Sequence, residues 1–144
     1  MNNDLHNSID QIRVIGPVAI GANATKTGVI VDRRGFGGVE FVCAYGAVTT
    51  TGTVCTVVVK EGDVTGTFLN DTAATEMGTV ALAGLLATTP RTSGVSQNVA
   101  KRIGYKGTKR YVQVNAVSTG VTSVGCVSVT ALLFNPAVAP LANP

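Results

Sequence analysis

Hydrophobic residues in this chain fall into short runs that alternate with polar residues, and turn-forming residues separate the runs. The clearest run is 111–116, where two valines and an alanine alternate with Tyr111, Gln113 and Asn115. Alternate side chains of a strand point to opposite faces, so this run predicts a half-buried strand. In the last run, Val127, Val129, Ala131 and Leu133 share one face.

Other runs of the same kind predict the remaining strands. The predicted strands are 13–20, 27–32, 39–45, 54–60, 99–105, 111–116 and 127–133. Gly16 and Pro17 interrupt the first, which indicates a sheet edge or a bulge. The chain lacks the regular amphipathic helices that parallel sheets need as crossovers. We therefore expect an all-β fold, a single antiparallel β-sandwich of jelly-roll type.

The segments outside these runs predict extended chain. Residues 1–12 form a polar N-terminal arm and residues 135–144 a proline-punctuated C-terminal tail, which leaves 13–134 as the domain. Residues 64–96 predict a long irregular excursion, with a short strand near Phe68 and a helical turn over 80–87. Long loops in compact domains are usually functional or ordered by a partner.

Composition supports strands, because apolar residues make up 45% of the chain and charged residues 13%. The apolar residues are mostly Val, Ala and Ile among Thr and Gly, and β-branched side chains suit a pleated sheet. No stretch approaches the ~20 apolar residues of a spanning helix, so no membrane association is expected. The first ten residues lack the pattern of a secretory signal, which predicts synthesis in a cytoplasm.

The three cysteines, Cys43, Cys55 and Cys126, predict buried free thiols, and a Cys43–Cys55 bridge is the alternative. Basic residues concentrate in one segment, where five of the 11 Lys and Arg residues fall within 101–110. This segment is either a solvated turn that protects a sheet edge or a docking site for an acidic protein surface or a phosphate backbone.

Candidate catalytic groups are sparse. The single histidine, His6, lies in the polar arm, and no Gly-x-Ser-x-Gly elbow is present. Four carboxylates, Glu61, Asp63, Asp71 and Glu76, match no calcium-loop spacing, and the glycines of 35–38 precede a strand rather than a helix. We therefore expect no enzyme, with no catalytic residue, cofactor, metal or small-molecule substrate.

Four segments carry a family resemblance: MNNDLH, GVIVDRRGFGGVEFV, VKEGD and AKRIGYKGTKRYVQVNAVSTG. The chain resembles the small virion proteins encoded beside the major capsid protein of tailed phages. It is most similar to the cement, or decoration, proteins of Bordetella-type podophages. The resemblance implies a jelly-roll protein on the outside of the mature shell that clamps neighbouring capsid subunits at two-fold positions.

The expected function is therefore structural, in a virion made in a bacterial cytoplasm. The expected partner is the major capsid protein, and a homo-oligomer, most simply a dimer, matches two-fold positions. Exposure and charge give the candidate capsid contacts Asp4, Leu5, His6, Ile9, Arg33, Arg34, Lys106, Lys109 and Arg110. The alternatives are a head-to-tail joint protein or a β-sandwich that binds nucleic acid or carbohydrate. The lack of Trp argues against sugar binding.

Overall fold

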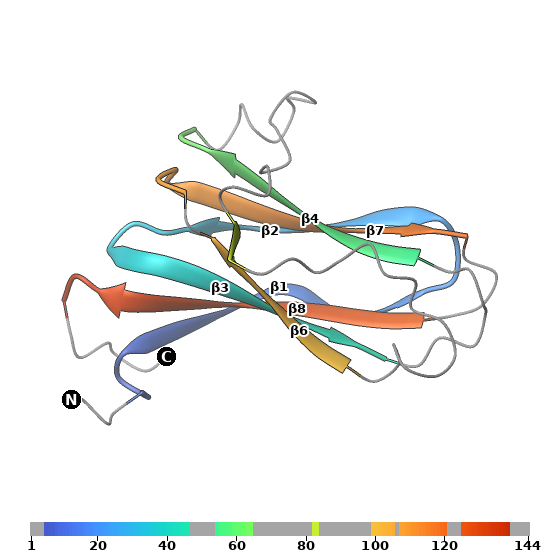
Figure 1. The fold of residues 1–144 in the computed structure, drawn as a ribbon, viewed down its shortest axis with the longest axis horizontal. Coiled ribbons are helices and arrows are strands. Elements are labelled where there is room, and N and C mark those ends of the chain that lie inside the picture. Colours follow the sequence, from blue (N-terminus) through green and yellow to red (C-terminus); the bar gives the residue numbers. More distant parts are fainter. Residues whose placement is uncertain are drawn as a thin grey trace.

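Two antiparallel sheets pack face to face in a computed structural model that describes residues 5–46, 54–64, 82–83, 99–105, 107–120 and 125–138 (Figure 1). The prediction of an all-β antiparallel sandwich is confirmed. The strands are β1 (Ile9–Ile20), β2 (Ala24–Asp32), β3 (Phe36–Tyr45), β4 (Val54–Gly62), β5 (Leu82–Ala83), β6 (Val99–Tyr105), β7 (Tyr111–Thr119) and β8 (Gly125–Pro136).

Strand pairing is nested from the two ends of the chain inward. Sheet A has the order β1-β8-β3-β6-β5 and sheet B has the order β2-β7-β4. The first strand therefore pairs with the last, β2 pairs with β7, and β3 pairs with β6. Every one of these ladders joins segments that lie far apart in the sequence.

The core lies between the two sheets and is built by the inward side of each alternating strand. In β8 the predicted face of Val127, Val129, Ala131 and Leu133 is buried, as are Val112, Val114 and Ala116 in β7. Phe41 of β3 and Ile103 of β6 complete the centre and are at most 1% exposed. Burying a side chain of this size contributes about 1.5–3 kcal/mol. The alternation read from the sequence is thus what places the core.

A bulge in β2 allows this strand to pack closely against Val14 of β1. The pairing of β2 with β7 shifts between Thr27 and Ile30, so an extra residue is accommodated there. A Cβ added at Gly28 would lie 2.5 Å from the Val114 carbonyl oxygen and 2.5 Å from Cγ1 of Val14. The Gly28 carbonyl accepts a hydrogen bond of 2.9 Å from the Gln113 side chain. Glycine is required here because neighbouring backbone fills the space of a side chain.

Several predicted strand bounds are too short at their ends. Residues 9–12 belong to β1 rather than to an arm, because Ile9 to Ile12 pair with Phe134 to Ala131 of β8. Strand β8 likewise continues to Pro136, into the predicted tail. Residues 1–4 and 139–144 lie outside the described part of the chain.

The predicted excursion over 64–96 falls almost entirely outside the described residues, including the strand expected near Phe68. Within it, the helical turn expected over 80–87 is wrong at Leu82 and Ala83, which form β5 by pairing with Tyr105 and Gly104. The edge of β6 offers backbone hydrogen bonds that local helix propensity does not anticipate.

Two further expectations about burial need correction. Cys126 is exposed rather than buried, because Val127 takes the inward position at that end of β8. Gln113 and Asn115 point away from the core yet are only 4% and 7% exposed, since β7 is the central strand of sheet B. Cys43 is buried in β3 of sheet A and takes part in no disulfide, so the alternative bridge to Cys55 is not formed. Cys55 belongs to β4 of sheet B, and the two strands are not neighbours.

We predict that Gly28→Ala destabilises the fold by about 1–3 kcal/mol, because the methyl group would overpack the contact with Val14 and β7. The matched control is Gly16→Ala, where an added Cβ finds its nearest atom at 3.7 Å. Chemical denaturation measures both variants. Equal stability of the two would contradict the close approach at Gly28.

Candidate functional site

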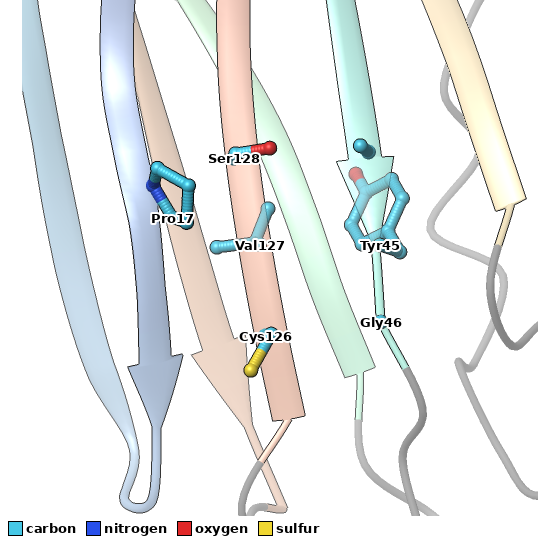
Figure 2. Close-up of a pocket in the computed structure, with 7 residues that line it drawn as sticks. Pro17, Tyr45, Gly46, Cys126, Val127 and Ser128 are labelled. Atoms are coloured by element: carbon cyan, nitrogen blue, oxygen red, sulfur yellow. The ribbon is translucent and has the colours of Figure 1, made fainter.

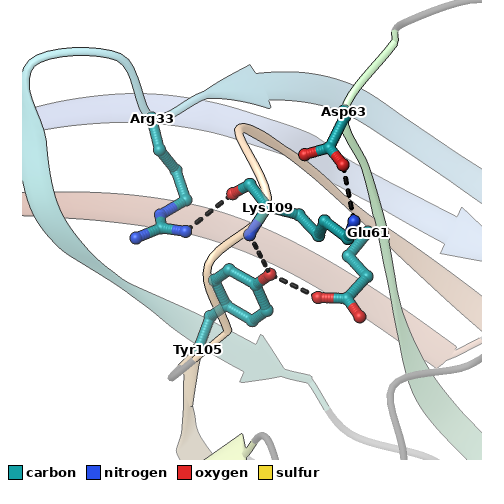
Figure 3. Close-up of polar contacts among 5 residues, drawn as sticks. All are labelled: Arg33, Glu61, Asp63, Tyr105 and Lys109. Carbon is teal, nitrogen blue, oxygen red and sulfur yellow. Dashed lines mark hydrogen bonds and ion pairs between the residues drawn. The ribbon is translucent and has the colours of Figure 1, made fainter.

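Charged and aromatic side chains gather at one end of the sandwich, where the β2–β3 turn, the β6–β7 turn and the end of β4 meet. Figure 3 shows its central members, Arg33, Glu61, Asp63, Tyr105 and Lys109. We call these residues, together with Asp32 and Arg110, the turn cluster. It contains three of the candidate contacts predicted from the sequence, Arg33, Lys109 and Arg110.

The β2–β3 turn is shaped by its own sequence. The Asp32 carboxylate accepts a hydrogen bond of 2.9 Å from the Arg34 amide, and the Phe36 amide donates to the Arg33 carbonyl at 2.9 Å. Gly35 has a φ of 88° at the third position, as a type II turn requires. The turn thereby directs Arg33 toward the β6–β7 turn.

Arg33 holds the β6–β7 turn in place. Its Nη1 donates to the carbonyls of Gly107 at 2.9 Å and Lys109 at 2.7 Å. Its guanidinium also lies 4.8 Å from the centroid of the Tyr105 ring, within the range of a cation–π contact. The sequence predicted Arg33 as a surface contact, but the structure uses its donors within the fold.

Tyr105 connects the two sheets at this end. Its hydroxyl donates a hydrogen bond to Glu61 of β4 and accepts one of 3.0 Å from the Lys109 amide. Burial and the hydrogen bond to Glu61 raise the pKa of Tyr105 to about 12. The hydroxyl is therefore protonated at neutral pH and available as a donor.

The remaining cations of the turn cluster have acidic partners. Lys109 Nζ lies 2.5 Å from Asp63, and the hydrogen bond to Asp63 raises the pKa of Lys109. Arg110 binds both carboxylate oxygens of Asp32, at 2.9 and 2.7 Å, and its guanidinium lies over the Tyr111 ring. The hydrogen bond from Arg110 lowers the pKa of Asp32. These pairs are exposed, so each stabilises the fold only weakly, but each neutralises a cation.

The other predicted contacts are scattered. Arg34 is exposed in the β2–β3 turn, Leu5 is 67% exposed, and His6 lies in an exposed turn before β1. Ile9 is half-buried at the start of β1, opposite Phe134. Asp4 and Lys106 lie outside the described residues. The structure thus brings Arg33, Lys109 and Arg110 together, and no hydrogen bond or ion pair among the described residues joins the N-terminal candidates to them.

Sequence reasoning missed the acidic half of the turn cluster. Glu61 and Asp63 stood out only as the end of a strand and as members of a carboxylate set that fits no calcium loop, and Tyr105 stood out only as an aromatic residue beside the basic segment. The available signal was charge complementarity, because a short acidic segment follows one strand and a basic segment follows another. Only the nested topology shows that these two segments meet.

A second feature is an open, mostly apolar hollow on the outer side of sheet A. It is lined by Pro17, Ala44, Tyr45, Gly46, Cys126, Val127 and Ser128. Figure 2 shows the Cys126 thiol and Pro17 on neighbouring strands at this hollow. The sequence did not indicate it, because its walls come from three strands.

We predict that Tyr105→Phe lowers the free energy of unfolding by about 1–3 kcal/mol, because Glu61 and the Lys109 amide both lose a hydrogen-bond partner. The folded pKa of about 12 exceeds the unfolded value near 10. The contribution of Tyr105 is therefore complete below pH 10 and lost as the pH rises toward 12. Denaturation as a function of pH tests this, and the variant should lack that alkaline loss.

We also predict that Asp32→Asn destabilises the protein at neutral pH and has a smaller effect in acid. Because the folded pKa is lowered, the Asp32–Arg110 pair contributes above the unfolded value near 3.9 and is lost as the pH falls through the folded pKa. Denaturation of both proteins at neutral and acid pH measures the difference. A difference independent of pH would mean that the carboxylate charge is not what stabilises this turn.

Within the described residues, no three His, Cys, Asp or Glu side chains come together as a metal site would require. The described residues also contain no helix long and apolar enough to cross a membrane. Comparisons with protein-family models, with curated proteins and with solved structures found no match to this chain.

Proposed function

We propose that this protein is a non-catalytic structural component of a phage virion, which binds the outside of the capsid and stabilises it by bridging major capsid protein subunits. The observation that carries the proposal is the nested pairing of strands in two sheets, taken together with the sequence resemblance to capsid cement proteins. No substrate, cofactor or metal takes part in this function.

The strand order supports a jelly roll. A jelly roll has two four-stranded sheets, which arise when a long antiparallel hairpin rolls up. Its first strand pairs with its last strand, the second strand with the seventh, and the third strand with the sixth. All three of these pairs occur here, joined by β3·β8 and β4·β7. The departure is β5, whose two described residues pair with β6 in sheet A. Jelly rolls are frequent in viral capsids and lectins.

The chemistry of the turn cluster supports a structural role over a catalytic one. The Tyr105 hydroxyl, the Glu61 carboxylate and Nη1 of Arg33 all form hydrogen bonds that join turns and strands. A general acid or base must instead reach a substrate proton. These three groups therefore stabilise the fold through hydrogen bonds within the protein.

The same pairing argues against nucleic-acid binding at this end of the molecule. A phosphate backbone is bound through cations that release counterions, and Lys109 and Arg110 already face Asp63 and Asp32. A head-to-tail joint role uses the same kind of protein contact and differs only in its place on the virion.

The test uses empty shells assembled from a major capsid protein of the genome that encodes this chain. We expect the purified protein to bind closed shells, not free subunits, and to raise the temperature at which the shells come apart, because binding one state stabilises that state. A shell that melts at the same temperature with and without bound protein would contradict stabilisation and leave decoration or a joint role. Absence of binding would contradict the proposal as a whole.

A second prediction concerns the N-terminal segment. Deletion of residues 1–8 should leave the sandwich folded, because β1 begins at Ile9. If Asp4, Leu5 and His6 contact the capsid, as the sequence indicates, the truncated protein should bind shells more weakly. Circular dichroism checks the fold, and sedimentation with shells measures occupancy. Unchanged occupancy would remove these three residues from the contact surface.

A further inference from the structure

The outer side of sheet A differs from the turn cluster in its chemistry. It is formed by the side chains of β1, β8, β3 and β6 that point away from the core, and we call it the sheet A face. Its middle combines half-buried Val42 and Leu132 with exposed Ala44 and Ala100. The hollow at Cys126 continues it at one end, and Phe134, 37% exposed, lies toward the other. Exposed apolar side chains that gather on one face, here beside Ser128 and Thr130 of β8, are typical of an interaction site.

Two arginines flank the middle of this face. Arg13 pairs with Thr130, Thr130 with Val42, and Val42 with Arg102, so the four residues form one row across four strands. Arg13 and Arg102 point outward because their neighbours in sequence, Val14 and Ile103, are buried. Adjacent strands are about 4.8 Å apart, which places the two arginine backbones about 14 Å from each other.

The charges on this face are available to a partner. The side chain of Arg102 is 76% exposed, and its Nε lies 3.8 Å from Glu40, which is only 24% exposed. This contact is longer than a hydrogen bond, so the guanidinium keeps its donors for another acceptor. Arg13 is also exposed. By contrast, Lys109 and Arg110 have close carboxylate partners.

We propose that the sheet A face docks on a protein surface that presents apolar side chains between two carboxylates about 14 Å apart. This inference rests on the proposed capsid-binding function and assigns that function to one face. Small side chains at Ala44 and Ala100 allow the partner backbone to approach closely, and the flanking arginines set its position.

Two other occupants fit the face less well. A nucleic acid would bring phosphates against Glu40 and leave the apolar middle without a partner, whereas nucleic-acid interfaces are strongly positive. A second copy of the face would offer, among the described outward side chains of sheet A, only the largely covered Glu40 as a carboxylate for two arginines. The acidic surface of a different protein can offer a carboxylate to each of the two arginines.

The charge test compares two double variants that change net charge equally. Arg13→Glu with Arg102→Glu alters the sheet A face. Lys60→Glu with Lys101→Glu is the control, because neither side chain belongs to the sheet A face. Lys60 follows the buried Val59 and projects from the outer side of sheet B, and Lys101 pairs with the buried Cys43 and so projects from the opposite side of sheet A. We expect the first pair to bind capsid shells at least about tenfold more weakly at low salt and the control to bind normally.

The shape test is independent of charge. Ala44→Gln adds bulk to the middle of the sheet A face, and Ala22→Gln adds the same bulk to the exposed turn between β1 and β2. We expect only Ala44→Gln to reduce shell binding. In the wild-type protein, alkylation of Cys126, mapped by peptide mass spectrometry, should slow when shells are bound.

The outcomes separate this inference from the function it rests on. If the wild-type protein binds shells and the sheet A variants bind equally well, with Cys126 still reactive, the inference is wrong and the capsid function stands. If the control pair alone loses binding, docking occurs elsewhere and the inference is wrong. If free protein self-associates and the sheet A variants abolish this, the face belongs to a second copy. Wild-type protein that binds no shell overturns both proposals.

Discussion

The pairing of the C-terminal strand with both β1 and β3 is the constraint on which the rest of this structure depends. Strand β8 lies between these two strands in sheet A, so the first and last segments of the chain must meet before either is stabilised. Because such pairings join distant segments, the entropic cost of closing long loops comes before the favourable free energy of burying apolar side chains. This order is typical of slowly folding all-β proteins. The apolar faces then close over a core centred on Phe41, Val129 and Leu133.

That closure also decides how polar groups are used. When the strands are rolled into two sheets, the end of β4 is brought beside the β6–β7 turn, and Glu61 meets Tyr105. Arg33 then spans the space between two turns and binds backbone carbonyls of one of them. Opposite charges that lie far apart in the sequence become local partners. Lys109 and Arg110 of the basic segment are thereby neutralised by the fold rather than presented to a partner.

The two sides of the sandwich consequently have different characters. In the three-stranded sheet, the outward amide of Gln113 is buried and satisfies a backbone carbonyl at the bulge. In the five-stranded sheet, small apolar residues and two outward arginines remain accessible. A protein interface combines an apolar centre with a polar rim, and the second side has both.

The sequence by itself determined the strand content, the inward positions of β7 and β8, and the glycine turn before β3, because each follows from a local period or a local φ requirement. Tertiary structure alone decided that Ile9 to Ile12 belong to the sheet, that Leu82 and Ala83 form a strand, and that Cys126 is exposed. It also decided that Lys109 and Arg110 face carboxylates and that Arg13 and Arg102 share a row. These properties depend on which strands become neighbours, and alternation along one strand carries no information about its partner.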